Sequence, residues 1–120
     1  MSKVHKRTGY RKGVLAEYAA AIFLIFKGYR ICARRYKSKF GETDLVARKK
    51  SCHVFIEVKY RSDYDTGVLS ISPRSQERIQ RAAQHYLLCE NIGQDSDMRF
   101  DAVIISPPFY VRHLINAWTS

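Results

Sequence analysis

The sequence predicts an α/β fold with a central mixed sheet flanked by helices. Two observations support this prediction: three strand patterns follow closely after a long helical pattern, and a second helical pattern separates them from further strands. Three consecutive strands favour an antiparallel meander, and a helix after the third strand favours a crossover to the fourth. The predicted order is therefore helix, three strands, helix, strand, strand.

Helical periodicity defines two segments. The first helix is expected over residues 9–28, where apolar side chains recur at helical spacing and Gly28 is expected to end the helix. Its second half is apolar nearly all round, so we expect it to be deeply buried. The second helix is expected over residues 73–89, with Pro73 in the first turn and Ser72 as the N-cap.

Runs of β-branched and aromatic residues define the strands. They are expected at residues 29–36, 42–48, 53–60, 98–106 and 110–118, and the last of these could instead form a helical turn. Residues 62–72, which include Gly67, are expected to form a loop. Residues 1–8 are expected to form a flexible basic arm, and residues 9–120 a single domain.

Composition limits the class of partner. The chain has 120 residues, with 21 Lys and Arg against 11 Asp and Glu, and a formal net charge of +10. This charge favours a polyanionic partner, nucleic acid before others, although a solvated basic surface or ribosome association would also account for it. The apolar fraction of 46% excludes wholesale disorder.

Targeting and cysteine patterns limit the compartment. No apolar run approaches the roughly 20 residues of a membrane span, and no signal peptide is visible before the first helix. Three cysteines at wide spacings argue against a disulfide framework and against a CxxC metal site. We therefore expect a reduced, cytoplasmic chain with no membrane partner.

The predicted second and third strands carry the residues that favour catalysis. Glu57 and Lys59 are two positions apart on one strand, so their side chains share a face. An even-length turn between the strands places Asp44 directly opposite Glu57, whereas an odd turn or a bulge would move it out of register. Two facing carboxylates repel each other, so we expect compensation by Lys59 or by a divalent cation such as Mg²⁺.

Such a metal would have a chemical use. A divalent ion held by Asp44 and Glu57 could activate water and stabilise charge on a phosphate, with Lys59 beside it as a proton acceptor or cation. The alternative for these three residues is a surface salt-bridge cluster. Glu17 and Gln76, on the two helices, are further candidates. Their alternatives are an exposed glutamate near a helix N-terminus and an ordinary polar helix residue.

Several motifs, in their order along the chain, resemble the YraN-like family, uncharacterised protein family 0102. They are Gly13-x-x-Ala16-Glu17, Gly41-Glu42-Thr43-Asp44-Leu45, Phe55-Ile56-Glu57-Val58-Lys59, Ser72-Pro73-x-x-Gln76 and Arg99-Phe100-Asp101-Ala102. The resemblance covers about residues 9–118, nearly the whole chain. Two positions depart from the pattern: Thr43 stands where relatives often have an aliphatic residue, and Ser75 stands where a lysine is frequent.

That family is similar to the restriction-endonuclease-like PD-(D/E)XK nucleases and to archaeal Holliday-junction resolvases. The resemblance implies an αβββαβ core, a nuclease-like domain, and a phosphodiesterase site that depends on Mg²⁺ or Mn²⁺. It implies catalytic roles for Glu17, Asp44, Glu57, Lys59 and Gln76, and metal contacts from Asp44, Glu57 and the backbone carbonyl of Val58. It also makes a homodimer an expectation, because a symmetric junction needs two active sites.

The leading functional hypothesis is a Mg²⁺-dependent endonuclease that hydrolyses phosphodiester bonds in DNA, including branched or structured DNA. A second hypothesis is a non-catalytic nucleic-acid-binding module that keeps the nuclease scaffold. A third is an assembly factor whose basic face meets an acidic protein.

Overall fold

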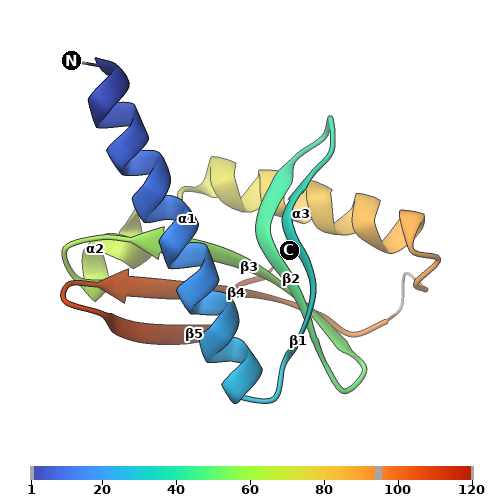
Figure 1. The fold of residues 1–120 in the computed structure, drawn as a ribbon. Helices are drawn as coiled ribbons and strands as arrows, with labels where there is room; N and C mark the ends of the chain where they lie inside the picture. Colours follow the sequence, from blue (N-terminus) through green and yellow to red (C-terminus); the bar gives the residue numbers. More distant parts are fainter. Residues whose placement is uncertain (1, 94–95, 120) are drawn as a thin grey trace.

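The computed structural model describes residues 2–93 and 96–119, with side chains from Gly13 onward (Figure 1). The elements, in chain order, are α1 (Ser2–Phe26), β1 (Arg30–Lys37), β2 (Glu42–Lys49), β3 (Cys52–Tyr60), α2 (Tyr64–Leu69), α3 (Pro73–Cys89), β4 (Met98–Ser106) and β5 (Tyr110–Trp118). The strands form a sheet in the order β1-β2-β3-β4-β5, in which β3 and β4 are parallel and the other neighbours are antiparallel. The predicted mixed sheet and the αβββαβ order are confirmed.

Helices cover both faces of the sheet. α1 lies across one face and α3 lies on the other (Figure 1). The core beneath α1 includes Leu24 and Ile56, and the core beneath α3 includes Phe55 and Ile79. Because strand side chains alternate, neighbouring residues of β3 enter opposite cores. A charged side chain on so central a strand therefore requires a partner or an opening to solvent.

The expected loop at residues 62–72 contains the short helix α2, so this prediction is wrong. Asp63 caps the helix, because its side chain accepts a hydrogen bond from the Thr66 N–H at 2.8 Å. Gly67 packs against β4 so closely that a Cβ atom there would come within 2.4 Å of Ile104 Cγ2. Glycine is required at this position because the helix packs closely against the sheet, not because the chain turns there. A helix of 6 residues is also too short to show helical periodicity in the sequence.

α1 includes residues 2–8, which the sequence predicts as an arm before the helix. The side chains of this stretch lie outside the described residues, and its flexibility stays a prediction. Gly9 does not mark a boundary, because glycine inside a helix costs only about 1 kcal/mol relative to alanine. The other end agrees with the prediction: Gly28 has a φ of +93°, and the Tyr29 N–H donates to the Leu24 carbonyl at 2.9 Å.

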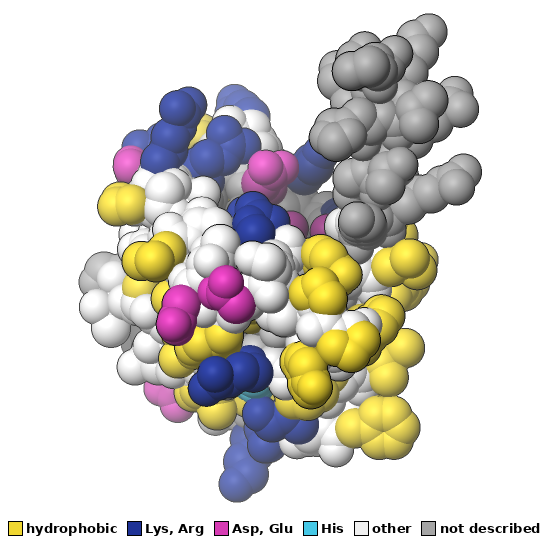
Figure 2. All heavy atoms as spheres, turned by 90° about the vertical axis from the view of Figure 1, so that its left-hand side faces the viewer, with side chains coloured by type: hydrophobic (Ala, Val, Ile, Leu, Met, Phe, Trp, Pro, Cys, Tyr) yellow, Lys and Arg dark blue, Asp and Glu magenta, His cyan; other side chains and the backbone are white. Residues whose placement is uncertain are grey.

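The predicted deep burial of the second half of α1 is wrong on one side of the helix. Leu24 faces the sheet and is fully buried, whereas Ile22, Ile25 and Phe26 are 54%, 55% and 88% exposed. The sheet covers one side of α1, and the described part of the chain adds no further layer over the other. Figure 2 shows hydrophobic side chains gathered along the right-hand side of that view. Even so, no helix within the described ranges has the length and hydropathy that crossing a membrane requires.

Candidate active site

The hairpin of β2 and β3 brings Asp44 and Glu57 together. Backbone pairing between the two strands ends at Leu45 and Ile56, and the next position on each strand is one of the two carboxylates. The register predicted from an even-length turn is therefore confirmed. Both carboxylates are half-buried and line the same cavity.

Where β2 and β3 separate, the Asp44 carboxylate replaces a backbone carbonyl as the hydrogen-bond acceptor for β3. Its Oδ2 accepts a hydrogen bond from the Val58 N–H at 2.8 Å. The Thr43 hydroxyl fills the space between the strands and lies 3.3 Å from the carbonyl oxygens of both Leu45 and Ile56. In an extended strand the N–H and C=O of one residue point to the same side, so the Val58 carbonyl also faces β2.

The Glu57 carboxyl is neutral near pH 7 in this arrangement. Burial, together with a hydrogen bond to Asp44 and the negative charge of that residue, raises the pKa of Glu57 to about 9, and the Lys59 ammonium only partly opposes the shift. The neutral Glu57 carboxyl donates its hydrogen bond to the Asp44 carboxylate. The Glu57 carboxyl thus keeps its proton at a position where a divalent ion would allow it to ionise.

Glu57→Gln is expected to stabilise the metal-free protein at pH 8 by about 1 kcal/mol or more. The Glu57 carboxyl ionises near pH 4.5 when unfolded but near pH 9 when folded. Between these values the unfolded state binds fewer protons than the folded state, so wild-type stability falls as the pH rises. Urea denaturation at pH 5 and pH 8 measures the effect. A stability difference that is the same at both pH values would contradict it.

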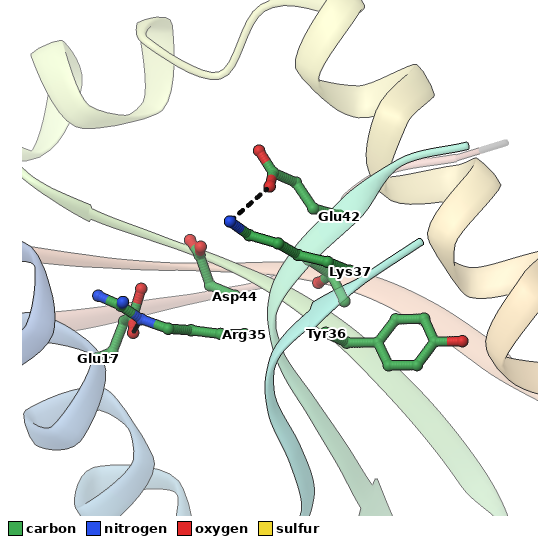
Figure 3. Close-up of a pocket in the computed structure, with 7 residues that line it drawn as sticks. Glu17, Arg35, Tyr36, Lys37, Glu42 and Asp44 are labelled. Carbon is green, nitrogen blue, oxygen red and sulfur yellow. Dashed lines mark hydrogen bonds and ion pairs between the residues drawn. The ribbon is translucent and has the colours of Figure 1, made fainter. Parts of the chain in front are cut away.

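Glu17 on α1 lies beside the carboxylate pair and is held by arginines from β1. The Arg35 Nε donates to Glu17 Oε1 at 2.6 Å, and Arg34 Nη1 lies 3.9 Å from the same oxygen. Figure 3 shows Glu17 and Arg35 pointing toward each other in a cavity that Asp44 also lines. Glu17 reaches the cavity as one half of an ion pair, and its catalytic role stays a prediction.

A backbone feature of β1 puts two consecutive arginines on one side of the sheet. Neighbouring residues of a regular strand face opposite ways, yet Arg34 and Arg35 both contact Glu17. Arg35 has a φ of +55°, a left-handed conformation that reverses the alternation. The next residue, Tyr36, consequently packs against Tyr86 on the other side. The sequence pattern did not predict a role for Arg35 in the site, because a left-handed residue that is not glycine leaves no signal in the sequence.

Two hollows that share residues open at this end of the sheet, and Figure 3 shows the smaller of them. The larger, of about 470 Å³, is lined by Gly13, Ala16, Glu17, Glu42, Asp44, Glu57, Val58, Lys59, Tyr60, Arg61 and Ser75. The smaller, of about 230 Å³, is lined by Glu17, Arg35, Tyr36, Lys37, Glu42, Thr43 and Asp44. Asp44 borders both hollows, so the carboxylate pair is reachable from solvent.

The predicted catalytic residues meet at the larger hollow with one exception. Its lining includes Glu17, Asp44, Glu57 and Lys59. Gln76 lies on α3 one residue from the lining: its side-chain amide donates to the Ile71 carbonyl at 3.3 Å, and Ser75 borders the hollow instead. The role of Gln76 stays a prediction.

The donor set fits a hard divalent cation. Over the part of the chain that the structure describes, no three His, Cys, Asp or Glu side chains are grouped as metal ligands. Mg²⁺ does not need three, because one or two carboxylates commonly hold it while water and phosphate oxygens complete its octahedral shell. Asp44 and Glu57 supply such a pair, and the Val58 backbone supplies a further oxygen beside them.

The sequence matches the family model of uncharacterised protein family UPF0102 over residues 16–105. A UPF0102 protein from Rhodopseudomonas palustris (strain BisB18) is 47% identical over 105 residues, which cover 88% of this chain and 78% of that protein. A UPF0102 protein from Parvibaculum lavamentivorans (strain DS-1) is 44% identical over 109 residues, which cover 91% of this chain and 82% of that protein. The chain therefore belongs to uncharacterised protein family UPF0102, the YraN-like family that its motifs predict.

Proposed function

We propose that this protein is a Mg²⁺- or Mn²⁺-dependent endonuclease that hydrolyses phosphodiester bonds in DNA, with branched or structured DNA as the expected substrate. The observation that carries the proposal is the facing pair of Asp44 and Glu57 at an open cavity, with the Lys59 ammonium beside them. Burial and mutual repulsion keep one of the two carboxyls protonated in the absence of a cation. A divalent ion would replace that proton and relieve the repulsion.

Each residue of the site has a role in the proposed reaction. Asp44, Glu57 and the Val58 carbonyl would hold the ion, which when bound would lower the pKa of a water molecule and neutralise phosphate charge. The Val58 N–H keeps the Asp44 carboxylate oriented toward the cavity. Lys59, on the same face as Glu57, would hold its ammonium near the phosphate as negative charge develops there.

The net charge of +10 supports a polyanionic substrate. Arg35 and Lys37 border the smaller hollow, and Lys59 and Arg61 border the larger one. Phosphates on either side of the cleaved bond would therefore meet cations. The three cysteines are free thiols, which suits the reducing cytoplasm that the sequence predicts.

Hydrolysis of labelled branched, single-stranded and duplex DNA tests the proposal. We expect cleavage with Mg²⁺ or Mn²⁺, none with EDTA, and the highest rate on a branched substrate. Calorimetry with Mn²⁺ should detect binding to the wild-type protein without DNA. If the protein binds no divalent ion and cleaves none of the three substrates, the proposed function is wrong.

The neutral state of Glu57 also suits a second candidate, a nucleic-acid-binding module without catalysis. A protonated Glu57 bound to Asp44 needs no metal for its own stability. This candidate predicts DNA affinity that is the same with and without Mn²⁺, and unchanged in Glu57→Gln. Under the endonuclease proposal, Mn²⁺ strengthens DNA binding by wild type, and Glu57→Gln removes that gain.

Arg35→Ala is expected to weaken DNA binding by about 5- to 10-fold and to make it less dependent on salt, by a slope change of about 1. The reason is that Arg35 is held at the mouth of the cavity by Glu17, where a phosphate can share its guanidinium. Fluorescence anisotropy at several NaCl concentrations measures both quantities. Arg30→Ala, an exposed arginine at the other end of β1, is the matched control. Equal effects of the two substitutions would contradict the role given to Arg35.

A further inference from the structure

The outer side of α1 is an apolar surface. From Gly13 to Phe26, the exposed side chains of the helix are all large and apolar, between 47% and 88% exposed: Leu15, Tyr18, Ile22, Ile25 and Phe26. They recur at intervals of three and four residues, so they form one continuous stripe along the helix. We call these five residues the α1 stripe. Figure 2 shows hydrophobic side chains gathered on this side of the molecule.

The α1 stripe contains no charged residue. Glu17, the acidic residue in this stretch of the helix, points the other way and is buried against Arg35. Of the residues whose side chains the structure describes, the cations beside the stripe lie at its borders: Arg34 stacks over the Tyr18 ring at 4.4 Å, and Lys27 directly follows Phe26. An uninterrupted apolar surface with a charged border is the organisation of a protein interface.

We propose that the α1 stripe is the interface of a homodimer in which the α1 helices of two copies pack against each other. A second copy presents the same stripe, so a twofold axis pairs apolar surface with apolar surface on both sides. Residues spaced three and four apart on both helices are those that interlock in a helix pair. This inference does not depend on whether the cavity hydrolyses DNA.

The available area sets the expected strength. Five large side chains, each about half-exposed or more, offer on the order of 500 Å² per copy, or about 1,000 Å² in total, which is the lower limit for a specific interface. The stripe extends for about 16 Å along the helix. We therefore expect a dissociation constant in the micromolar range rather than an obligate dimer.

Charge gives the proposal a distinctive signature. Each copy carries +10, so two copies repel each other, while the stripe itself holds no ion pair that salt could weaken. Screening by salt should therefore strengthen the dimer. Binding to DNA or to an anionic vesicle through basic residues should respond in the opposite direction, because salt weakens such contacts.

Sedimentation equilibrium of the full chain, at 1 to 100 µM in 0.1 M and 0.5 M NaCl, tests the proposal. We expect a monomer–dimer equilibrium whose dissociation constant falls at the higher salt concentration. Ile22→Glu, at the centre of the stripe, should raise that constant at least 10-fold, and so should Phe26→Glu at the most exposed position. Leu88→Glu is the control, since Leu88 is equally an exposed apolar residue but lies on α3.

Three results would overturn the proposal. The first is a wild-type protein that stays monomeric at 100 µM in both salt concentrations. The second is an equal effect of Phe26→Glu and Leu88→Glu, because the dimer would then not use the stripe. The third is a monomer that binds vesicles of anionic lipid through the stripe, lost in Phe26→Glu, which would assign the surface to a membrane. Thermal unfolding of each variant confirms that it is folded, and Phe26, at 88% exposed, is the substitution least able to disturb the core.

Discussion

Asp44→Asn and Glu57→Gln are each expected to reduce divalent-ion-dependent DNA cleavage by about 10³-fold, which corresponds to about 4 kcal/mol of transition-state stabilisation. Each substitution removes one anionic ligand and leaves a side chain of nearly the same shape. The remaining carboxylate then faces a neutral amide. This pair carries a single negative charge, so it needs no cation to relieve repulsion and binds a cation only weakly. The loss should therefore appear both in cleavage rate and in calorimetric Mn²⁺ binding.

Glu77→Gln is the matched control. Glu77 is an exposed acid on α3, and its Oε1 lies 2.6 Å from Arg81 Nη2 in an ion pair at the surface. Its cleavage rate and Mn²⁺ affinity should equal those of wild type. The pH dependence adds a second test: since Glu57 must release a proton to bind the ion, Mn²⁺ affinity of wild type should rise from pH 7 toward pH 9, the pKa of that group being about 9. Equal cleavage by wild type and both site variants would show that a contaminating nuclease is responsible.

The second large effect is expected at Asp101, the centre of a buried network at the start of β4. Asp101 is fully buried and accepts hydrogen bonds from Arg99 at two positions, each 2.8 Å, and from the Asn116 N–H at 2.9 Å. His113 Nε2 lies 2.7 Å from the same carboxylate. The Lys27 ammonium donates to His113 Nδ1 at 2.7 Å, so Nε2 carries the proton that His113 donates to Asp101.

Asp101→Ala is expected to destabilise the protein by about 3 to 5 kcal/mol, because it leaves the Arg99 guanidinium without its counter-charge and leaves both Arg99 and His113 without their hydrogen-bond acceptor. Urea denaturation at pH 7 measures the loss. Asp97→Ala, an exposed aspartate just before β4, should change stability by less than about 0.5 kcal/mol. Similar losses in the two variants would contradict the role of the network.

The same network predicts acid sensitivity. Burial alone would raise the pKa of Asp101, but hydrogen bonds from His113 and Arg99 outweigh burial and hold the pKa below its ordinary value of 3.8. A carboxylate with a depressed pKa stabilises the fold fully above pH 3.8 and loses that contribution as the pH falls through the folded value. The difference between wild type and Asp101→Ala should therefore shrink at pH 2 to 3, as followed by circular dichroism.

The carboxylate pair could be predicted because it depends on the spacing of residues along two strands and on the length of the turn between them. Strand alternation puts Glu57 and Lys59 on one face, and an even-length turn puts Asp44 opposite Glu57. Both rules act over a few residues, and the observed register follows them. The Glu17–Arg35 ion pair could not be predicted, because it joins residues of two elements through a left-handed backbone conformation at Arg35.

Asp101 likewise combines a feature visible in the sequence with partners that only the folded structure shows. Its motif belongs to the family resemblance, yet its function depends on His113 from β5 and Lys27 from the end of α1. These groups are far apart in the sequence and come into contact only when α1 packs against the sheet. A residue's need for a partner is visible in its chemistry, whereas the identity of that partner is a property of the packed chain.

The amino-acid sequence by itself determined the order of the strands and of the two long helices, though not the short helix α2, together with the β2–β3 register and the net charge, because periodicity, turn length and ionisation are local properties. Tertiary structure alone decided which side of α1 remains exposed, which arginines reach Glu17, and that Glu57 keeps its proton near pH 7. These outcomes depend on which elements pack together and on how much water they exclude, and both are set by contacts between residues distant in the chain.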